Sequence, residues 1–469
     1  MLFLCSLLVV AILSFTGCGN GEINWQKMDL DSMESAERAE ILAKAVEQEM
    51  NKLDSYAQRM DLDFVMVTGG TRVESSAIEE VKIANQNSEN YQYRAYKSNV
   101  VKSGNTRKSF TTVEGFQDGE MYFKREEGSN KINFRSDVSR EEFIVHLNSN
   151  IESFSNVFIK DDITCTQESE KNESGWLVKL SDFSESYIKA MEKKMGITAL
   201  FSNGALEDIE FDFYITEQMH YEKIEIRFIT KEDMDSASYK FEVTECKIVF
   251  SDLNETQVRT EDIAEYEEVP DLRVLYVIEN SFDAIKNAEN GKFTLFLSQT
   301  LTGDKELEVK EFSDISYKIK DGKITYTCES TVNDEQILLT FENGEKKEYS
   351  ISEDGEQELK KTTKVPQISQ IAFIEGVIEI IPFDKSSIKN FTKTDVPGQY
   401  KFEYIATDAL INQYRYSGYS ATDKSTYFIY VTFEEGRMVS YEIDFQIIYR
   451  NSWSEYTADI ESEAVFEKY

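Results

Sequence analysis

The alternation of apolar and polar positions along the chain predicts strands interrupted by a few short helices. Leu42, Val46 and Met50 recur at the spacing of one helix face, which predicts an amphipathic helix that ends near Tyr56. From Met60 to Phe64 apolar and acidic residues alternate instead, as in a strand with one covered and one wet face. The same patterns predict further strands at 91–96, 108–113, 121–125, 176–180, 209–215, 223–229 and 239–249, and helices that begin near 139 and 184.

The second half of the chain repeats this order after an acidic break. Residues 252–271 hold eight acidic residues and one arginine, so self-repulsion and a lack of apolar residues predict a linker. Beyond it a helix at 275–285 precedes an alternating segment at 292–297, and the turn at 341–345 echoes the turn at 116–120. This pattern predicts two copies of one domain. The predicted plan is a signal peptide at 1–18, a tether at 19–31, a first domain at 32–251, the acidic linker at 252–271 and a second domain at 272–469.

The first 18 residues have the pattern of a bacterial lipoprotein signal peptide. The apolar run from Leu2 to Leu13 is too short to cross a bilayer core, which needs about 20 residues. It ends in Leu-Ser-Phe-Thr-Gly-Cys18, which resembles the lipobox, whose cysteine is diacylated and becomes the mature N-terminus. Phe15 is bulkier than the usual residue and a basic segment is missing, so an ordinary cleaved signal or an anchor helix is the alternative. We expect acyl chains such as palmitate on Cys18 to hold the protein on the outer face of the cell membrane.

Helices and strands are segregated within each half, which indicates antiparallel sheets rather than strand–helix–strand units. We expect an α+β fold with two tandem copies of a curved antiparallel β-sheet, a half-barrel, wrapped over a few helices. The order of elements in both halves, together with the lipobox, resembles the LolA-like superfamily, which includes the lipoprotein carrier LolA and the mycobacterial lipid-carrier lipoproteins of the LppX type. The resemblance implies that each sheet encloses an apolar cavity that is covered by helices and holds acyl chains. It has no diagnostic motif and therefore assigns no individual functional residue.

Composition argues against several classes of function. A net charge of −36 would repel nucleic acid and anionic lipid headgroups. Cys165, Cys246 and Cys328 are widely spaced, so buried free thiols are expected, with a Cys165–Cys246 bridge left open. His146 and His220 lack the neighbours that a zinc site requires, and we expect no metal and no cofactor. The G-x-S-x-G, H-E-x-x-H and phosphate-loop motifs are absent, which predicts that the protein has no catalytic residues and is not an enzyme.

Aromatic residues are frequent in the predicted strands, with 30 Phe and 25 Tyr in the chain. Strands that are apolar on both faces must be covered by a second layer or by a ligand. A closed core is the alternative to a cavity, because aromatic stripes in strands usually pack against other side chains. The residues predicted to line a ligand cavity are Phe64, Trp176, Phe213, Phe228, Phe296, Tyr404 and Phe445.

Together these features predict a non-catalytic, extracytoplasmic lipoprotein that binds a hydrophobic ligand, a lipid or an acyl chain, in cavities of its sheets. The alternative is a surface interaction protein of the envelope with no small-molecule ligand. A hydrolytic or cation-binding envelope enzyme is a third, weaker interpretation. The expected partners are the cytoplasmic membrane through Cys18, a lipid ligand and an envelope protein, but no nucleic acid.

Overall fold

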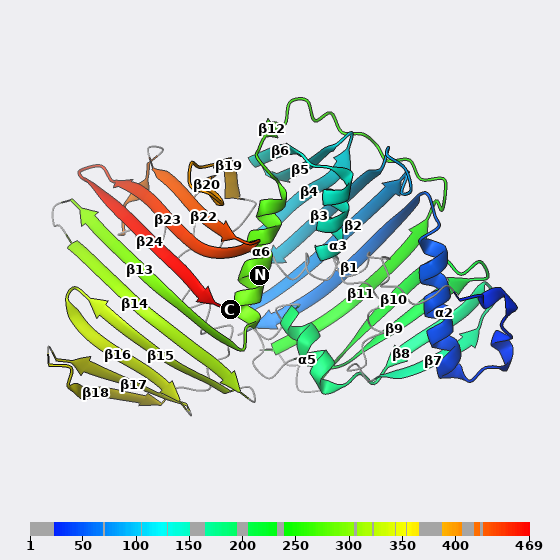
Figure 1. Ribbon diagram of the computed structural model, residues 1–469, viewed down its shortest axis with the longest axis horizontal. Helices are drawn as coiled ribbons and strands as arrows, with labels where there is room; N and C mark the ends of the chain where they lie inside the picture. Colours follow the sequence, from blue (N-terminus) through cyan, green and yellow to red (C-terminus); the bar gives the residue numbers. More distant parts are fainter. Residues whose placement is uncertain are drawn as a thin grey trace. The chain divides into compact units, whose positions relative to one another are not determined.

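The computed structural model describes residues 23–68, 71–104, 106–128, 130–150, 165–194, 205–231, 239–303, 307–320, 323–342, 344–352, 354–364, 387–405, 417–422 and 425–469 (Figure 1). The chain divides into two compact units, with the boundary between Glu268 and Val269. Each unit is built around one large, mainly antiparallel sheet.

The first unit holds a twelve-stranded sheet and, in its described residues, three α-helices. The strands run in the order β12-β6-β5-β4-β3-β2-β1-β11-β10-β9-β8-β7, and among the described pairings of this sheet only that of β12 with β6 is parallel. Short 3-10 turns at Trp25–Lys27 and Leu30–Ser32 precede the first helix. The elements are α2 (Ser35–Met50), β1 (Tyr56–Thr68), β2 (Thr71–Ala84), β3 (Gln92–Ser103), β4 (Thr106–Gln117), β5 (Glu120–Glu127), β6 (Asn130–Asp137), α3 (Arg140–Asn150), β7 (Thr166–Lys171), β8 (Gly175–Ser181), α5 (Glu185–Lys194), β9 (Leu206–Thr216), β10 (Tyr221–Thr230), β11 (Tyr239–Ser251) and β12 (Glu267–Glu268).

The second unit begins with one helix and continues as a second twelve-stranded sheet. Its strands run in the order β18-β17-β16-β15-β14-β13-β24-β23-β22-β20-β19, with β21 paired to β23 beside this path. The elements are α6 (Arg273–Asn287), β13 (Asn290–Thr302), β14 (Leu307–Lys320), β15 (Lys323–Val332), β16 (Glu335–Glu342), β17 (Glu345–Ile351), β18 (Gln357–Lys364), β19 (Ile388–Lys393), β20 (Gln399–Tyr404), β21 (Ser420–Ala421), β22 (Thr426–Glu434), β23 (Arg437–Arg450) and β24 (Glu455–Lys468).

The two sheets follow the same path. In each, the first strand lies in the middle and pairs on one side with the second strand and on the other with the last long strand (β1 with β2 and β11, β13 with β14 and β24). Tight hairpins then extend the sheet outward, as at Asp118 and Gly119 between β4 and β5, where both residues adopt positive φ. The same order of eleven strands therefore occurs twice in the chain.

Alternation along the strands explains why one face of each sheet is covered. On β1, Met60, Leu62 and Phe64 are buried, whereas the intervening Asp61 and Asp63 are half-buried on the other face. Successive side chains of a strand point to opposite faces, so this pattern directs the apolar residues to a single side.

The expected α+β class is wrong, because the chain is mostly β and its two large sheets are not wrapped over a helical layer. The longest described helix has 16 residues, while several strands reach 13 or 14. Long antiparallel neighbours satisfy each other's backbone hydrogen bonds in one continuous ladder, so the sheet needs helices only in a few connections. The sequence pattern indicates a short helix as clearly as a long strand. The expectation based on it therefore overstates the fraction of the fold that is helical.

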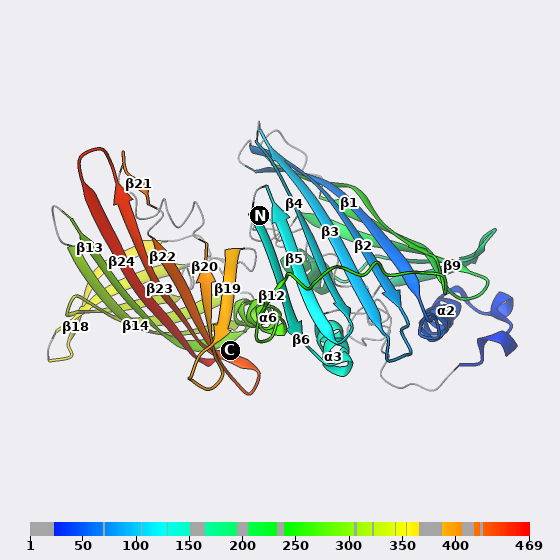
Figure 2. The ribbon, with the colours of Figure 1, turned by 90° about the horizontal axis from the view of Figure 1, so that it is seen from above.

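The acidic segment that precedes the unit boundary packs against the first sheet before it reaches β12 (Figure 2). Ile263 and Tyr266 lie against Val113 and Tyr122. Arg94 pairs with Glu261 at 3.0 Å, and the Gln117 side chain donates to the Glu261 carbonyl and accepts from its N–H. These contacts hold residues 261–266 on the first unit.

Candidate functional site

Helix α3 identifies the covered face of the first sheet, the face toward which Tyr93 and Phe116 point. Phe143 on α3 is fully buried, and its ring centroid lies 4.8 Å from that of Phe116 and 5.4 Å from that of Tyr93. Tyr93 and Phe116 are directly opposite each other on β3 and β4. Val113 and Tyr122, which contact the acidic segment, point to the other face because they are out of phase with these residues.

A group of four long or amide side chains on three neighbouring strands lies among the apolar residues of this covered face. We call Gln58, Glu79, Lys97 and Asn99 the polar row. Glu79 on β2 is directly opposite Lys97 on β3, and the register places Asn99 and Gln58 on the same face one step away. Diagonal neighbours in a sheet are about 7–8 Å apart, within reach of long side chains. The row therefore brings one carboxylate, one ammonium group and two amides together.

Three members of the polar row are buried without being fully hydrogen-bonded, and Lys97 is half-buried. The exposed fractions of Gln58, Glu79 and Asn99 are 3%, 6% and 4%. Glu79 and Lys97 approach to 3.5 Å, yet Glu79 Oε2, Gln58 Oε1 and Asn99 Oδ1 have no hydrogen-bond partner. An unpaired buried oxygen costs about 1–3 kcal/mol, so three on one face indicate a place where a donor from outside the protein can bind.

Burial also changes the electrostatics of the row. Desolvation raises the pKa of Glu79 above its ordinary value, the Lys97 ammonium opposes this rise, and the Glu114 carboxylate adds to it. The sequence does contain a signal for this site. On β2, Glu79 stands in phase with the buried Ala77 and Val81, and a charged residue in phase with apolar neighbours points to the covered side.

Side chains at the other end of the sheet anchor α2 and α5. Arg38 on α2 donates to the carbonyl and the hydroxyl of Ser169 at 2.7 and 2.9 Å and stands 5.2 Å from the Trp176 ring. Ahead of α5, Phe183 packs edge-on against Phe211 at 5.6 Å. Helices therefore meet the sheet at separate points rather than along one layer.

The four cavity residues predicted in the first unit share its covered face. Phe64, Trp176, Phe213 and Phe228 are all buried, and the cross-strand register places them on the same side as Met60. Their contact with a ligand stays a prediction.

The three residues predicted in the second unit do not lie together. Tyr404 and Phe445 are buried on the face that carries Phe341, as the register from β16 to β20 requires. Phe296 points to the opposite face, where it is directly across from Phe312, which is 47% exposed. We call this side the outer face of the second sheet.

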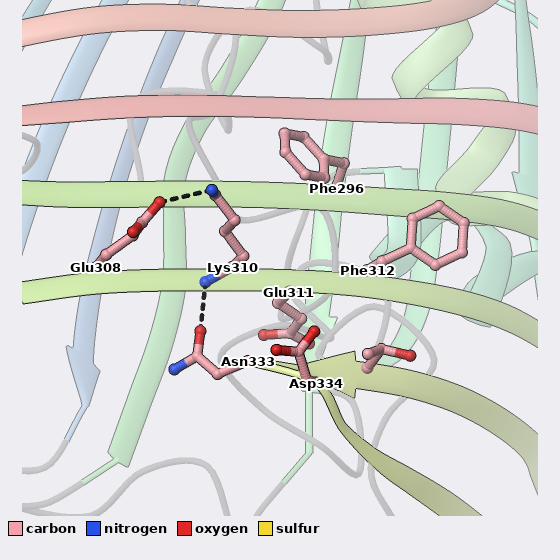
Figure 3. Close-up of a pocket in the computed structure, with 8 residues that line it drawn as sticks. Phe296, Glu308, Lys310, Glu311, Phe312, Asn333 and Asp334 are labelled. Carbon is pink, nitrogen blue, oxygen red and sulfur yellow. Dashed lines mark hydrogen bonds and ion pairs between the residues drawn. The ribbon is translucent and has the colours of Figure 1, made fainter. Parts of the chain in front are cut away.

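Phe296 and Phe312 line a shallow depression of about 490 Å³ on that outer face (Figure 3). Lys310 is the cation in it, and it pairs with Glu308 at 2.6 Å. The backbone N–H of Lys310 donates to Asn333 at 2.8 Å. The depression is open and about half of its lining is polar, unlike an acyl-chain cavity.

In the described residues no group of His, Cys, Asp and Glu side chains is arranged to hold a metal ion. Cys165, Cys246 and Cys328 form no disulfide among the residues that the structure describes. None of the helices in the described part of the chain is both long and apolar enough to span a bilayer. Cys18 lies outside the described residues.

No protein-family model matches the chain, and no curated protein matches its sequence. Among solved structures, the match with LprF from Mycobacterium bovis covers 41% of this chain and 93% of the LprF chain, with 9% identity and a TM-score of 0.22. The translocator domain of autotransporter NalP from Neisseria meningitidis covers 90% of this chain and 92% of its own, with 7% identity and a TM-score of 0.10. Transferrin Binding Protein B from Haemophilus parasuis Hp5 covers 88% and 76%, with 6% identity and a TM-score of 0.15. These TM-scores are too low to support an argument about function.

Proposed function

We propose that the chain is a non-catalytic lipoprotein of the cell envelope, anchored through Cys18, that holds an amphipathic lipid on the covered face of its first sheet. The observation that carries the proposal is a wide aromatic face that contains buried, unpaired oxygens. A purely structural core would pair its polar atoms or replace them with apolar groups. A ligand with a long apolar part and a polar group matches both features of this face.

Helix α3 supports a binding role because few of its side chains are buried. Over residues 140–147 only Phe143 and His146 are buried, whereas α2 is held by six buried residues and by Arg38. A cover held by few side chains opens at a lower free-energy cost than a continuous packed layer. An extracytoplasmic location agrees with the lipobox-like segment that ends at Cys18.

The test is native mass spectrometry of residues 19–469 purified without detergent, with organic extraction of the same sample. The proposal expects a lipid at defined stoichiometry, or binding of added lipid if the protein is isolated empty. The Phe213→Leu variant changes the covered face and should weaken binding, whereas Phe312→Leu on the outer face of the second sheet should not. Failure of both the purified protein and the add-back experiment to bind lipid would exclude this function.

A surface that binds a basic protein is the second candidate function. On the outer face of the second sheet, Glu442 is directly opposite Glu463, and Asp444 is directly opposite Glu461. Like charges in such pairs are destabilising, and burial together with these neighbours raises the pKa of Glu442. A basic partner would relieve the repulsion. Titration with a lysine-rich peptide at low and high salt tests this, and an absence of binding at low salt would exclude it.

A further inference from the structure

The two sheets carry different chemistry at equivalent positions of their covered faces. Tyr93 and Phe116 in the first sheet correspond to Tyr326 and Phe341 in the second, because each pair joins the third and fourth strands of the same topology. Lys97 lies four residues after Tyr93, and Ser330 lies four residues after Tyr326. Lys97 therefore corresponds to Ser330.

The same register relates the rest of the polar row to the second sheet. Glu79 lies opposite Lys97, and Ser313 lies opposite Ser330, so Glu79 corresponds to Ser313. Counting along the strands, Asn99 corresponds to Val332 and Gln58 corresponds to Phe293. The first unit thus carries charged and amide groups where the second carries hydroxyl and apolar groups.

The row in the second sheet satisfies itself. The Ser313 and Ser330 hydroxyls are 2.7 Å apart and buried, and Ser313 donates to Glu311 at 2.9 Å. Cys328 Sγ lies 3.1 Å from the Ser330 hydroxyl. Nothing in this set requires an external donor, in contrast to the three unpaired oxygens of the polar row.

We propose that the first unit selects a ligand with an uncharged hydroxyl group, which is bound at Gln58, Glu79, Lys97 and Asn99 inside the covered face. A hydroxyl group donates to one unpaired oxygen and accepts from Lys97, so it uses both kinds of atom in the row. A charged group of either sign would lose its hydration and also meet a like charge, Glu79 or Lys97, at close range. The second unit, with its paired row, does not discriminate in this way. This assignment rests on the proposed lipid-binding function and names the chemistry of that ligand.

The experiment compares two probes with the same acyl chain by titration calorimetry on residues 19–469. 1-Decanoylglycerol carries two hydroxyl groups, and methyl decanoate carries none. We expect the hydroxylated probe to bind about tenfold more tightly, the effect of one satisfied buried hydrogen bond. Decanoate and decylammonium, the charged versions of the chain, should bind more weakly than 1-decanoylglycerol.

Asn99→Val places the residue of the second unit in the first and should weaken the preference, because it removes one of the three acceptors, while leaving methyl decanoate binding intact. Gln58→Leu is the second variant, and both should fold because each removes an unpaired polar atom. Ser98→Val, on the opposite face of β3, is the matched control and should keep the full preference. Because the Ser313 and Ser330 hydroxyls of the second unit pair with each other, a site of equal affinity for both probes is assigned to that unit.

Four outcomes separate the hypotheses. A preference in the wild-type protein that is weakened in Asn99→Val or Gln58→Leu and kept in Ser98→Val supports the hydroxyl-binding row, and a preference unchanged in both variants overturns it. Equal binding of both probes by the wild-type protein overturns the row but leaves the lipid-binding function standing. Binding of neither probe overturns the proposed function itself.

Discussion

Phe143 is the residue whose removal should separate α3 from the first sheet. Its side chain is fully buried, and its ring contacts those of Phe116, Tyr93 and Tyr91 at centroid distances of 4.8, 5.4 and 6.2 Å. Replacing a buried Phe with Ala costs about 3–5 kcal/mol, a range that includes the cavity left behind. The remaining described links from α3 to the sheet region include Arg140, which donates to the Gln86 carbonyl at 2.9 Å. One such hydrogen bond contributes only about 1 kcal/mol.

We therefore expect Phe143→Ala to lower the local opening free energy of α3 by about 3 kcal/mol or more. Hydrogen exchange followed by mass spectrometry measures this local opening separately for each segment, so α3 can be followed although the chain has two units. Amides of α3 should exchange more than a hundredfold faster, because each 1.4 kcal/mol corresponds to a factor of ten. Val145→Ala on the same helix is the control, since Val145 is 68% exposed and should change stability by less than about 0.5 kcal/mol.

The reasoning is wrong if exchange in α3 of Phe143→Ala rises less than tenfold, or no more than in Val145→Ala. Such a result would mean that other contacts hold the helix and that the aromatic stack is not its anchor. If the exchange rises as expected, lipid release from Phe143→Ala should also be faster, which links the cover to the proposed function.

Three further predictions concern charge, packing and anchoring. Because burial raises the pKa of Glu79, the stability of the wild-type protein should fall as pH rises from 4.5 through the pKa of the folded state. The melting temperature of Glu79→Gln relative to wild type should therefore increase over that interval, and a constant difference would contradict this. Gly115→Ala should destabilise the first unit by about 1–3 kcal/mol in urea unfolding. The reason is that the alanine Cβ would lie 2.3 Å from the Tyr122 ring and 2.6 Å from the Tyr93 carbonyl. An unchanged unfolding midpoint would contradict this close contact. Cys18→Ser should abolish labelling by palmitate and move the protein out of the membrane fraction, and retention of both would exclude the anchor.

Part of the candidate site can be read from the sequence. Phe64 and Phe213 belong to segments with clear alternation, and both lie on the covered face. Phe296 does not, because its strand is apolar in both phases, with Phe293 and Leu295 in one phase and Phe296 in the other. Periodicity of two assigns residues to two faces, but it cannot say which face is covered when both carry apolar residues.

The polar row depends on pairing between strands. Glu79 and Lys97 are eighteen positions apart and meet because the β2–β3 hairpin sets their register. A shift of one residue would send either side chain to the opposite face. The contact between Arg94 and Glu261 spans 167 positions and likewise follows from the fold rather than from any local pattern.

The sequence by itself determined the local structure: which segments alternate as strands, where short helices interrupt them, and the lipobox-like segment that predicts an anchor at Cys18. Side-chain period and turn chemistry act over a few residues, so they are legible in one dimension. Only the tertiary structure decided that the class is mostly β, that the strands join into two sheets of the same order, and that buried oxygens of Gln58, Glu79 and Asn99 share one face. These features arise from hydrogen-bond register and burial between segments distant in the chain, and no local pattern encodes them.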